Sequence, residues 1–263
     1  MNENSRPSSN CLEQELNFRR HKSSVNDADI LVLFPHAGGS ASVFHSYIEE
    51  LTTEWEVIVI QYPGREWRYR SPLKTSLYDY ADEIVISLNA LDVEIGRMIF
   101  FGHSMGAKIA YEVACRLTET PKLLIASCSP APDVAPSHSL ASGCPSKDLI
   151  AYLKKLGGTV SDVLDNHELM EIILPVIQSD FQCLESYLSS VVKIPLNSPI
   201  IGLSANKDMA VSSDLVRSWS SWTNKHFFLK VVNGGHFYFH EESPHIFKDN
   251  INSMLEMLIV ADS

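Results

Sequence analysis

The fold is decided by residues 97–114, which read Arg97-Met-Ile-Phe-Phe-Gly-His-Ser-Met-Gly-Ala-Lys-Ile-Ala-Tyr-Glu-Val-Ala114. An apolar run from Met98 to Phe101 meets the pattern Gly102-His-Ser-Met-Gly106. Small residues then recur at helical spacing. The segment therefore predicts a buried strand, a sharp turn and a helix.

The glycines of this turn have a mechanical purpose. A serine on a tight strand-to-helix turn takes a strained backbone conformation, and its neighbours lack room for a side chain because strand and helix pass close together. Gly102 and Gly106 supply that room. The Ser104 hydroxyl would project from the carboxyl end of the strand, with the backbone N–H of Met105 pointing toward an oxyanion formed there. We predict Ser104 as a nucleophile; the alternative is a chance Gly/Ser loop.

Strand and helix patterns alternate on both sides of this segment. Continuous apolar runs predict buried strands at 30–34, 57–60, 98–101, 123–128, 199–204 and 227–232. Helical spacing predicts helices at about 40–51, where Ser40 or Ser42 would cap, and at about 76–91, 211–222 and 244–259. Right-handed crossovers then give a mostly parallel sheet with helices on both faces, which is the α/β-hydrolase arrangement.

The alternation stops between about residues 134 and 194. Helical stretches at 146–156, 166–173 and 176–188 are expected there, and an insertion after a strand's carboxyl end would form a lid over the site. The alternative is an ordinary packing excursion. Residues 1–28 are a polar extension, in which 12–18 would add an edge strand or a short helix. Residues 29–263 are expected to form one domain that includes the lid.

Composition limits the classes of function. A net charge of −11 argues against non-specific binding of nucleic acid. The five cysteines are scattered and show neither a disulfide framework nor metal-ligand spacing, so no metal is expected. No apolar run has the length of a membrane span, and the N-terminus does not resemble a secretory signal. We expect a cytoplasmic monomer.

The serine needs a base and an acid that orients the base. In the α/β-hydrolase order these follow the serine along the chain, each after a strand. Asp208 follows the strand at 199–204, and His236 follows the strand at 227–232 directly after two glycines. We predict this pair. The competitors are His240, His245, His103 and Asp214.

Two loops after strands complete the expected site. The turn His36-Ala-Gly-Gly39 predicts the N–H of Ala37 as the second oxyanion donor, although the glycines would also serve merely to turn the chain. The loop after residue 60 carries the densest basic cluster. Its members are Arg65, Arg68, Arg70 and Lys74. We predict that they contact a carrier protein or a phosphate; the alternative is a solvated loop.

From about residue 30 to its end, the sequence resembles the type II thioesterases that accompany polyketide synthases and non-ribosomal peptide synthetases. The matching motifs are Phe34-Pro-His-Ala-Gly-Gly-Ser40, Pro63-Gly-Arg-Glu66, Phe101-Gly-His-Ser-Met-Gly-Ala107, Leu156-Gly-Gly-Thr159, Glu168-Leu-Met170, Leu174-Pro175, Asp180-Phe181 and Gly234-Gly-His-Phe237. Lys108-Ile109 departs from the family, whose members are often apolar there, and the N-terminal extension is longer than expected.

The resemblance implies hydrolysis of acyl thioesters on the phosphopantetheine arm of acyl or peptidyl carrier proteins, without a cofactor. It assigns Ser104 as nucleophile, His236 as base, Asp208 as orienting acid, and Ala37 and Met105 as oxyanion amides. A medium-chain fatty acyl carrier thioesterase, an esterase or lipase acting on free oxyesters, an acyltransferase and a non-catalytic binding module are the alternatives.

Overall fold

A computed structural model describes residues 11–14, 17–135, 146–157 and 166–262. Its centre is one eight-stranded sheet with the order β1-β2-β4-β3-β5-β6-β7-β8. The strands are β1 (Cys11–Gln14), β2 (Phe18–His21), β3 (Ile30–Phe34), β4 (Glu56–Ile60), β5 (Met98–His103), β6 (Leu123–Ser127), β7 (Ile200–Ala205) and β8 (Phe227–Val232). Strands β3 to β8 run parallel, and β1 and β2 are antiparallel at one edge. The mostly parallel sheet is confirmed.

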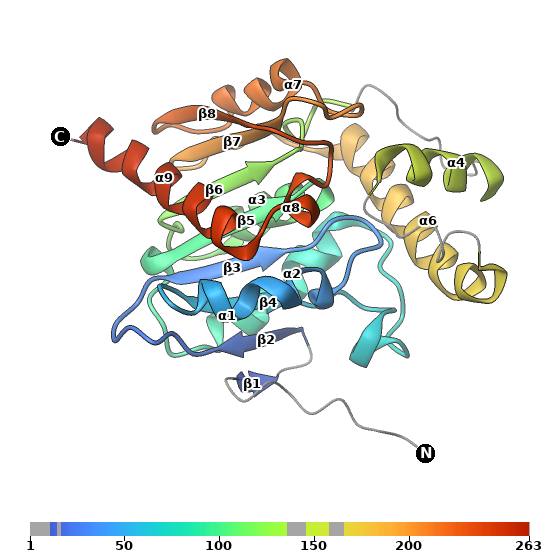
Figure 1. Cartoon of the computed structure of the whole chain (residues 1–263), viewed down its shortest axis with the longest axis horizontal. Helices are drawn as coiled ribbons and strands as arrows, with labels where there is room; N and C mark the ends of the chain where they lie inside the picture. The colour runs from blue at the N-terminus through green and yellow to red at the C-terminus, as the bar shows by residue number, and fades with distance from the viewer. Residues whose placement is uncertain (1–10, 15–16, 136–145, 158–165, 263) are drawn as a thin grey trace.

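Helices cover both faces of this sheet (Figure 1). The α-helices are α1 (Ile48–Leu51), α2 (Leu77–Asn89), α3 (Met105–Arg116), α4 (Ser146–Leu156), α6 (His167–Ser190), α7 (Ser213–Arg217), α8 (Tyr238–Glu241) and α9 (Pro244–Asp262). Short 3-10 helices are η1 (Ala41–Tyr47), η2 (Glu66–Arg68), η3 (Ile95–Arg97) and η4 (Ser218–Ser221). No helix in the described part of the chain is long and apolar enough to cross a membrane.

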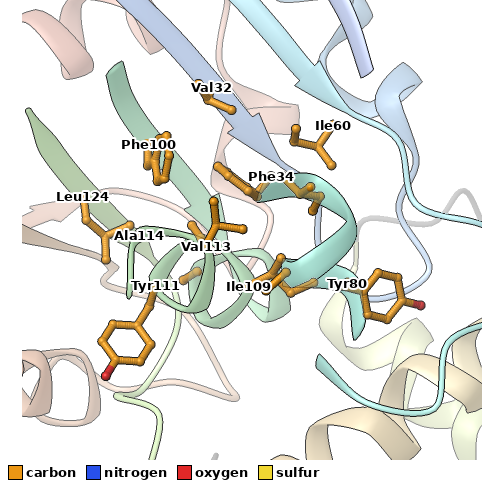
Figure 2. Close-up of a cluster of buried hydrophobic side chains, with 14 of the residues drawn as sticks. Val32, Phe34, Ile60, Tyr80, Phe100, Ile109, Tyr111, Val113, Ala114 and Leu124 are labelled. Atoms are coloured by element: carbon orange, nitrogen blue, oxygen red, sulfur yellow. The ribbon is translucent and has the colours of Figure 1, made fainter. Parts of the chain in front are cut away.

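The central strands are buried on both faces, which explains their continuous apolar sequences. Every residue of β3, β5, β6 and β7 is buried. Because successive side chains point to opposite faces, β3 contributes Val32 and Phe34 to one core and Leu31 and Leu33 to the other. Figure 2 shows the first core, where sheet residues such as Phe34 face α3.

Two predicted α-helices are partly replaced by 3-10 helix in the structure. The segment after β3 is mainly the 3-10 helix η1, and Ser40 makes no capping hydrogen bond. The Ser40 hydroxyl instead donates to Glu66 Oε1 at 2.6 Å, a contact that local sequence rules do not reveal. The helix expected at 211–222 divides into α7 and η4, and α7 is capped by Ser212, whose Oγ accepts from the N–H of Leu215.

The two helices expected at 166–173 and 176–188 form one helix, α6, which passes through Pro175. An interior proline costs a helix about 3 kcal/mol because it lacks an N–H and clashes with the preceding turn. Burial of one face on both sides of the proline opposes this cost, since Met170, Val176 and Ile177 are buried. The break predicted at Pro175 is therefore wrong.

The sheet begins before the expected domain boundary at residue 29. β1 is the edge strand and pairs with β2, so the edge-strand alternative is confirmed for residues 12–14, whereas Phe18, which is buried in the core, begins β2, which pairs with β4. Residues 1–10 and 15–16 of the predicted extension lie outside the described residues, as do 136–145 and 158–165 of the predicted lid. The described parts of that insertion, α4 and α6, lie beyond the carboxyl ends of the parallel strands (Figure 1).

Candidate active site

The turn between β5 and α3 has the strained geometry that the sequence predicts. Ser104 takes φ 55° and ψ −116°, and its N–H donates to the carbonyl of Ser127 at 2.8 Å. A Cβ on Gly102 would lie 2.5 Å from the backbone of Ala107, and one on Gly106 would lie 2.2 Å from a carbonyl oxygen of β3. Both positions therefore require glycine, because real Cβ atoms do not approach backbone so closely. The half-buried Ser104 stands at the tip of this turn.

Two further loops bring a histidine and a carboxylate together. His236 Nδ1 lies 2.7 Å from Asp208 Oδ2, and both side chains are buried. The other carboxylate oxygen accepts hydrogen bonds from the N–H groups of Ala210 at 2.8 Å and Val211 at 3.0 Å. Held in this orientation, the Asp208 carboxylate accepts from His236 and favours the His236 tautomer that carries its proton on Nδ1. Nε2 of His236 is then left as an acceptor.

The loops that carry these two residues are joined by two hydrogen bonds, one to a side-chain oxygen and one between backbone groups. The N–H of Gly234 donates to Asn206 Oδ1 at 3.1 Å, and the N–H of Lys207 donates to the carbonyl of Gly234 at 2.9 Å. These contacts link the chain after β7 to the chain after β8. The pairing of β7 with β8 places the two loops side by side, and these bonds hold Asp208 and His236 in place relative to each other.

A largely apolar cavity opens beside these groups. Ser104, His236, Ala37 and Met105 all line it, so the structure brings the four predicted residues to one space. The opposite wall comes from the inserted helices, with Tyr152 and Leu156 of α4 and with Phe181, Leu184 and Leu188 of α6. The arrangement suits a nucleophile, a base and two backbone donors acting on a ligand with an apolar chain.

A family model for the thioesterase domain matches residues 29–254. The chain belongs to the thioesterase domain family. Among curated proteins, it is 34% identical to thioesterase PikA5 of Streptomyces venezuelae over 93% of this chain and 87% of that protein. It is also 34% identical to the probable anguibactin biosynthesis thioesterase AngT of Vibrio anguillarum, over 84% of this chain and 89% of that protein.

Solved structures of thioesterases agree with this assignment. RedJ, from the prodiginine pathway of Streptomyces coelicolor, superposes with a TM-score of 0.77 at 29% identity, covering 87% of this chain and 90% of RedJ. YbtT, a type II thioesterase from the yersiniabactin pathway, gives 0.78 at 29% identity, covering 88% of this chain and 94% of YbtT. The α/β-hydrolase fold and the resemblance to type II thioesterases are confirmed.

Burial disfavours the charged form of two further histidines near the site of this thioesterase, His36 and His103. Burial, with smaller contributions from His240, His236 and Arg65, lowers the pKa of His36 to about 3. Burial also lowers the pKa of His103, which hydrogen-bonds Ser127 Oγ at 3.0 Å through Nδ1. His103 is thus completely buried at the end of β5 and does not act as the base in place of His236.

The remaining competitors, His240, His245 and Asp214, are not among the described residues that line the cavity with Ser104. His245 is exposed, its Nδ1 lies 3.3 Å from Glu50 Oε1, and it does not line the cavity. Asp214 lies in the first turn of α7. His240 lies in α8, a short helix that precedes α9.

One group of possible metal ligands occurs among the described residues. Atoms of Cys128, Asp208 and His236 lie within 4.8 Å of one another. Burial, reinforced by the carboxylate of Asp208, raises the pKa of the Cys128 thiol, whereas metal binding needs the thiolate. The Asp208 oxygens are also occupied by His236 and two backbone amides. These residues therefore fit a hydrogen-bonded pair better than a metal site.

The predicted carrier contacts divide sharply between buried and exposed residues. Arg65 is 7% exposed and forms two hydrogen bonds with the buried Asp180, at 2.8 and 3.0 Å. Arg68 is 4% exposed and pairs with Glu83. The prediction is wrong for these two, because a guanidinium held inside the protein is not available to a partner.

Arg70 remains exposed, and Lys74 is half-buried. Arg70 is exposed and lies over the ring of Tyr69, with its guanidinium carbon 5.1 Å from the ring centroid. Lys74 lies 2.7 Å from Glu83 Oε2. A carrier contact by these two stays a prediction.

Sequence reasoning missed two buried charged groups near the cavity. Asp180 was noted solely as part of a motif, and Lys108 solely as a departure from the family. Lys108 follows Ser104 by one helical turn, lines the cavity and donates to the carbonyls of Pro130 at 3.0 Å and Ala131 at 2.8 Å. The signal available in the sequence was a charged residue at an apolar position of an otherwise buried helix face.

Proposed function

We propose that this thioesterase releases acyl groups from the phosphopantetheine arm of carrier proteins in polyketide or non-ribosomal peptide synthesis, as an editing enzyme with Ser104 as nucleophile. The observation that carries the proposal is the meeting of Ser104, the His236–Asp208 pair and two inserted helices around one apolar cavity. Support also comes from YbtT, which is described as a type II thioesterase from an NRPS/PKS pathway, and from AngT, which is described as a probable anguibactin biosynthesis thioesterase.

Acylation begins when Ser104 Oγ attacks the thioester carbonyl carbon and His236 Nε2 takes the hydroxyl proton. The carbonyl oxygen becomes an oxyanion, which accepts hydrogen bonds from the N–H groups of Ala37 and Met105. Each preset donor lowers the barrier by about 3 kcal/mol. The C–S bond then breaks, the pantetheine sulfur leaves as the thiol with the proton from His236, and the acyl group remains as an ester of Ser104.

Deacylation repeats the steps with water. His236 Nε2 removes a proton from the water as its oxygen attacks the ester carbonyl, and the same two amides stabilise the second oxyanion. Collapse returns the proton to Ser104 Oγ and releases the carboxylic acid. Asp208 keeps its negative charge throughout and stabilises the imidazolium, because its carboxylate contacts Nδ1 at 2.7 Å. These reaction steps require no metal or cofactor.

The wall of the cavity indicates where the acyl chain lies. Leu156 of α4 and Phe181, Leu184 and Leu188 of α6 line it together with the Ser104 turn. Apolar side chains in these positions favour an alkyl or aryl chain, since its burial contributes about 0.8 kcal/mol per methylene. In this proposal α4 and α6 act as the lid and set the preference for chain length.

Carrier docking needs local features, because this chain has a net charge of −11 and carrier proteins are generally acidic. With Arg65 and Arg68 buried, the exposed Arg70 remains the strongest basic candidate of the cluster. We propose that it contacts the carrier near the cavity.

The test follows an acyl-loaded carrier protein by intact-protein mass spectrometry. Native enzyme should remove acetyl and longer acyl groups from the arm, whereas Ser104→Ala should not. A matched assay uses a p-nitrophenyl ester, which any serine esterase would hydrolyse. Rapid ester hydrolysis with no loss from several carriers would replace the proposal by an oxyester hydrolase. Failure of Ser104 to react with a fluorophosphonate would instead point to a non-catalytic binding module.

A further inference from the structure

A carboxylate inside the protein connects the lid helix α6 to the loop that carries Ala37. The Asp180 side chain is completely buried. Its Oδ2 accepts from the N–H of Gly38 at 2.7 Å and from Arg65 Nη1 at 2.8 Å. Its Oδ1 accepts from Arg65 Nη2 at 3.0 Å and from the Tyr80 hydroxyl at 2.7 Å. Four charge-assisted hydrogen bonds hold this carboxylate in one orientation.

Arg65 holds the same loop at a second point. Nη1 donates to the carbonyl of Gly39 at 2.9 Å, and Nε donates to the carbonyl of Pro63 at 3.1 Å. The loop itself turns through a hydrogen bond from the N–H of Gly39 to the carbonyl of His36 at 2.9 Å. The pair Arg65–Asp180 therefore fixes one amide and one carbonyl of consecutive residues in this loop.

The helix also packs directly on the loop. Gly38 has φ +74°, and a Cβ there would lie 2.6 Å from Ile177 Cγ1 of α6. Ile177 is one helical turn before Asp180, so both residues face the loop from the same side of the helix. Contact and hydrogen bond together make α6 a part of the loop's immediate support.

We infer that Asp180 is a positioning residue for the oxyanion site, so that docking of α6 completes the catalytic centre as well as covering it. The hydrogen bond from the Gly38 N–H to Asp180 Oδ2 fixes the peptide plane between Ala37 and Gly38. A fixed plane on this side of Ala37 restricts the direction in which the Ala37 N–H points. An oxyanion donor displaced by a fraction of an ångström loses much of its effect, since it must meet the oxygen at hydrogen-bond distance. This inference rests on the proposed function, in which the Ala37 amide binds the oxyanion.

A different contact of α6 provides the matched control. The Tyr187 hydroxyl donates to Glu112 Oε1 at 2.6 Å, and both residues are buried. This bond also anchors α6 to the core, two helical turns beyond Asp180, but it does not reach the Ala37 loop. If Asp180 merely anchors the helix, removal of either contact will change the enzyme in the same way.

The experiment compares Asp180→Ala, Asp180→Asn and Tyr187→Phe with the native enzyme. The first readout is the rate at which Ser104 is modified by a fluorophosphonate, followed by intact mass, because its phosphoryl oxygen takes the place of the oxyanion. The second is kcat and KM for a carrier-bound acyl thioester. The third is the melting temperature of each variant, which reports the structural effect separately.

We expect Asp180→Ala to slow both phosphonylation and kcat by about tenfold to a hundredfold, with KM changed by no more than about threefold. Asp180→Asn retains an oxygen acceptor for Gly38 and should recover most of the loss. Tyr187→Phe should lower the melting temperature yet keep kcat within about twofold of the native value. Equal losses of kcat in Asp180→Ala and Tyr187→Phe, or native rates in Asp180→Ala, would overturn the inference.

Removing one member of a buried ion pair can prevent folding, because it leaves the other charge unpaired. The double variant Arg65→Met with Asp180→Leu removes both charges and keeps apolar packing. It should fold and remain slow in both assays; native rates in a folded double variant would refute the inference. An inactive native enzyme, in contrast, would count against the proposed function and not against the role of Asp180.

Discussion

Lys108 makes the stability of this thioesterase depend on pH in a direction that can be calculated. It lies on α3 and is 3% exposed, with its ammonium on two carbonyl oxygens and no hydrogen-bonded carboxylate among the described residues. Burial lowers the pKa of Lys108 from the ordinary 10.5 to about 7, although Asp133 raises it slightly. Folding therefore disfavours the charged form of this side chain.

The sign follows from the protons bound in each state. Between pH 7 and 10.5 the unfolded chain keeps the Lys108 proton, while the folded chain loses it. The unfolded state binds more protons in this window, so the free energy of unfolding rises with pH. Below about pH 7 both states are protonated and the effect is constant. From about pH 7 to about pH 9 the free energy of unfolding rises by about 2 kcal/mol, because each proton bound only by the unfolded state contributes about 1.4 kcal/mol per pH unit.

The variant Lys108→Met retains most of the side-chain length and removes the titrating group. Urea unfolding of both proteins at pH 7 and pH 9 gives the change in unfolding free energy for each. We expect the native protein to gain about 2 kcal/mol relative to Lys108→Met over this interval. The exposed Lys225 supplies the control, since Lys225→Met should leave the pH dependence of the native protein unchanged.

Comparing the two pH values cancels any constant effect of the methionine, such as the loss of hydrogen bonds to the carbonyls of Pro130 and Ala131. The reasoning is refuted if the native protein and Lys108→Met show parallel pH dependence. If the unfolding free energy of Lys225→Met rises between pH 7 and pH 9 by a different amount from that of the native protein, groups other than Lys108 control the pH dependence.

Three further outcomes are expected. Asp208→Asn should lower kcat by about 10³–10⁴-fold with little change in melting temperature, because the amide favours the wrong tautomer of His236; a loss below about tenfold would exclude this role. Gly106→Ala should yield little folded protein, since its Cβ would meet a carbonyl oxygen at 2.2 Å, whereas Gly96→Ala, with no atom within 4 Å, should behave as the native protein in circular dichroism. Arg70→Glu should raise KM for a carrier-bound thioester by about threefold to tenfold and leave KM for a small thioester unchanged; equal changes on both substrates would remove the carrier contact.

The sequence by itself determined the parts of this protein that depend on neighbouring residues. Continuous apolar runs located the six parallel strands to within about two residues of their observed bounds. The paired glycines predicted the strained turn, because the close approach of strand and helix is a local steric requirement. Strand order along an α/β chain then predicted that Asp208 and His236 would meet, and they lie 2.7 Å apart.

Tertiary structure decided which charged side chains are buried and what they contact. Arg65 and Arg70 follow the same strand and look alike in sequence, yet one is 7% exposed and the other lies at the surface. The difference arises from Asp180, which lies 115 residues from Arg65 in the chain. The uninterrupted course of α6 through Pro175 has a similar origin in packing. Local patterns cannot show these features, because burial and ion pairing depend on residues that meet only after the chain has folded.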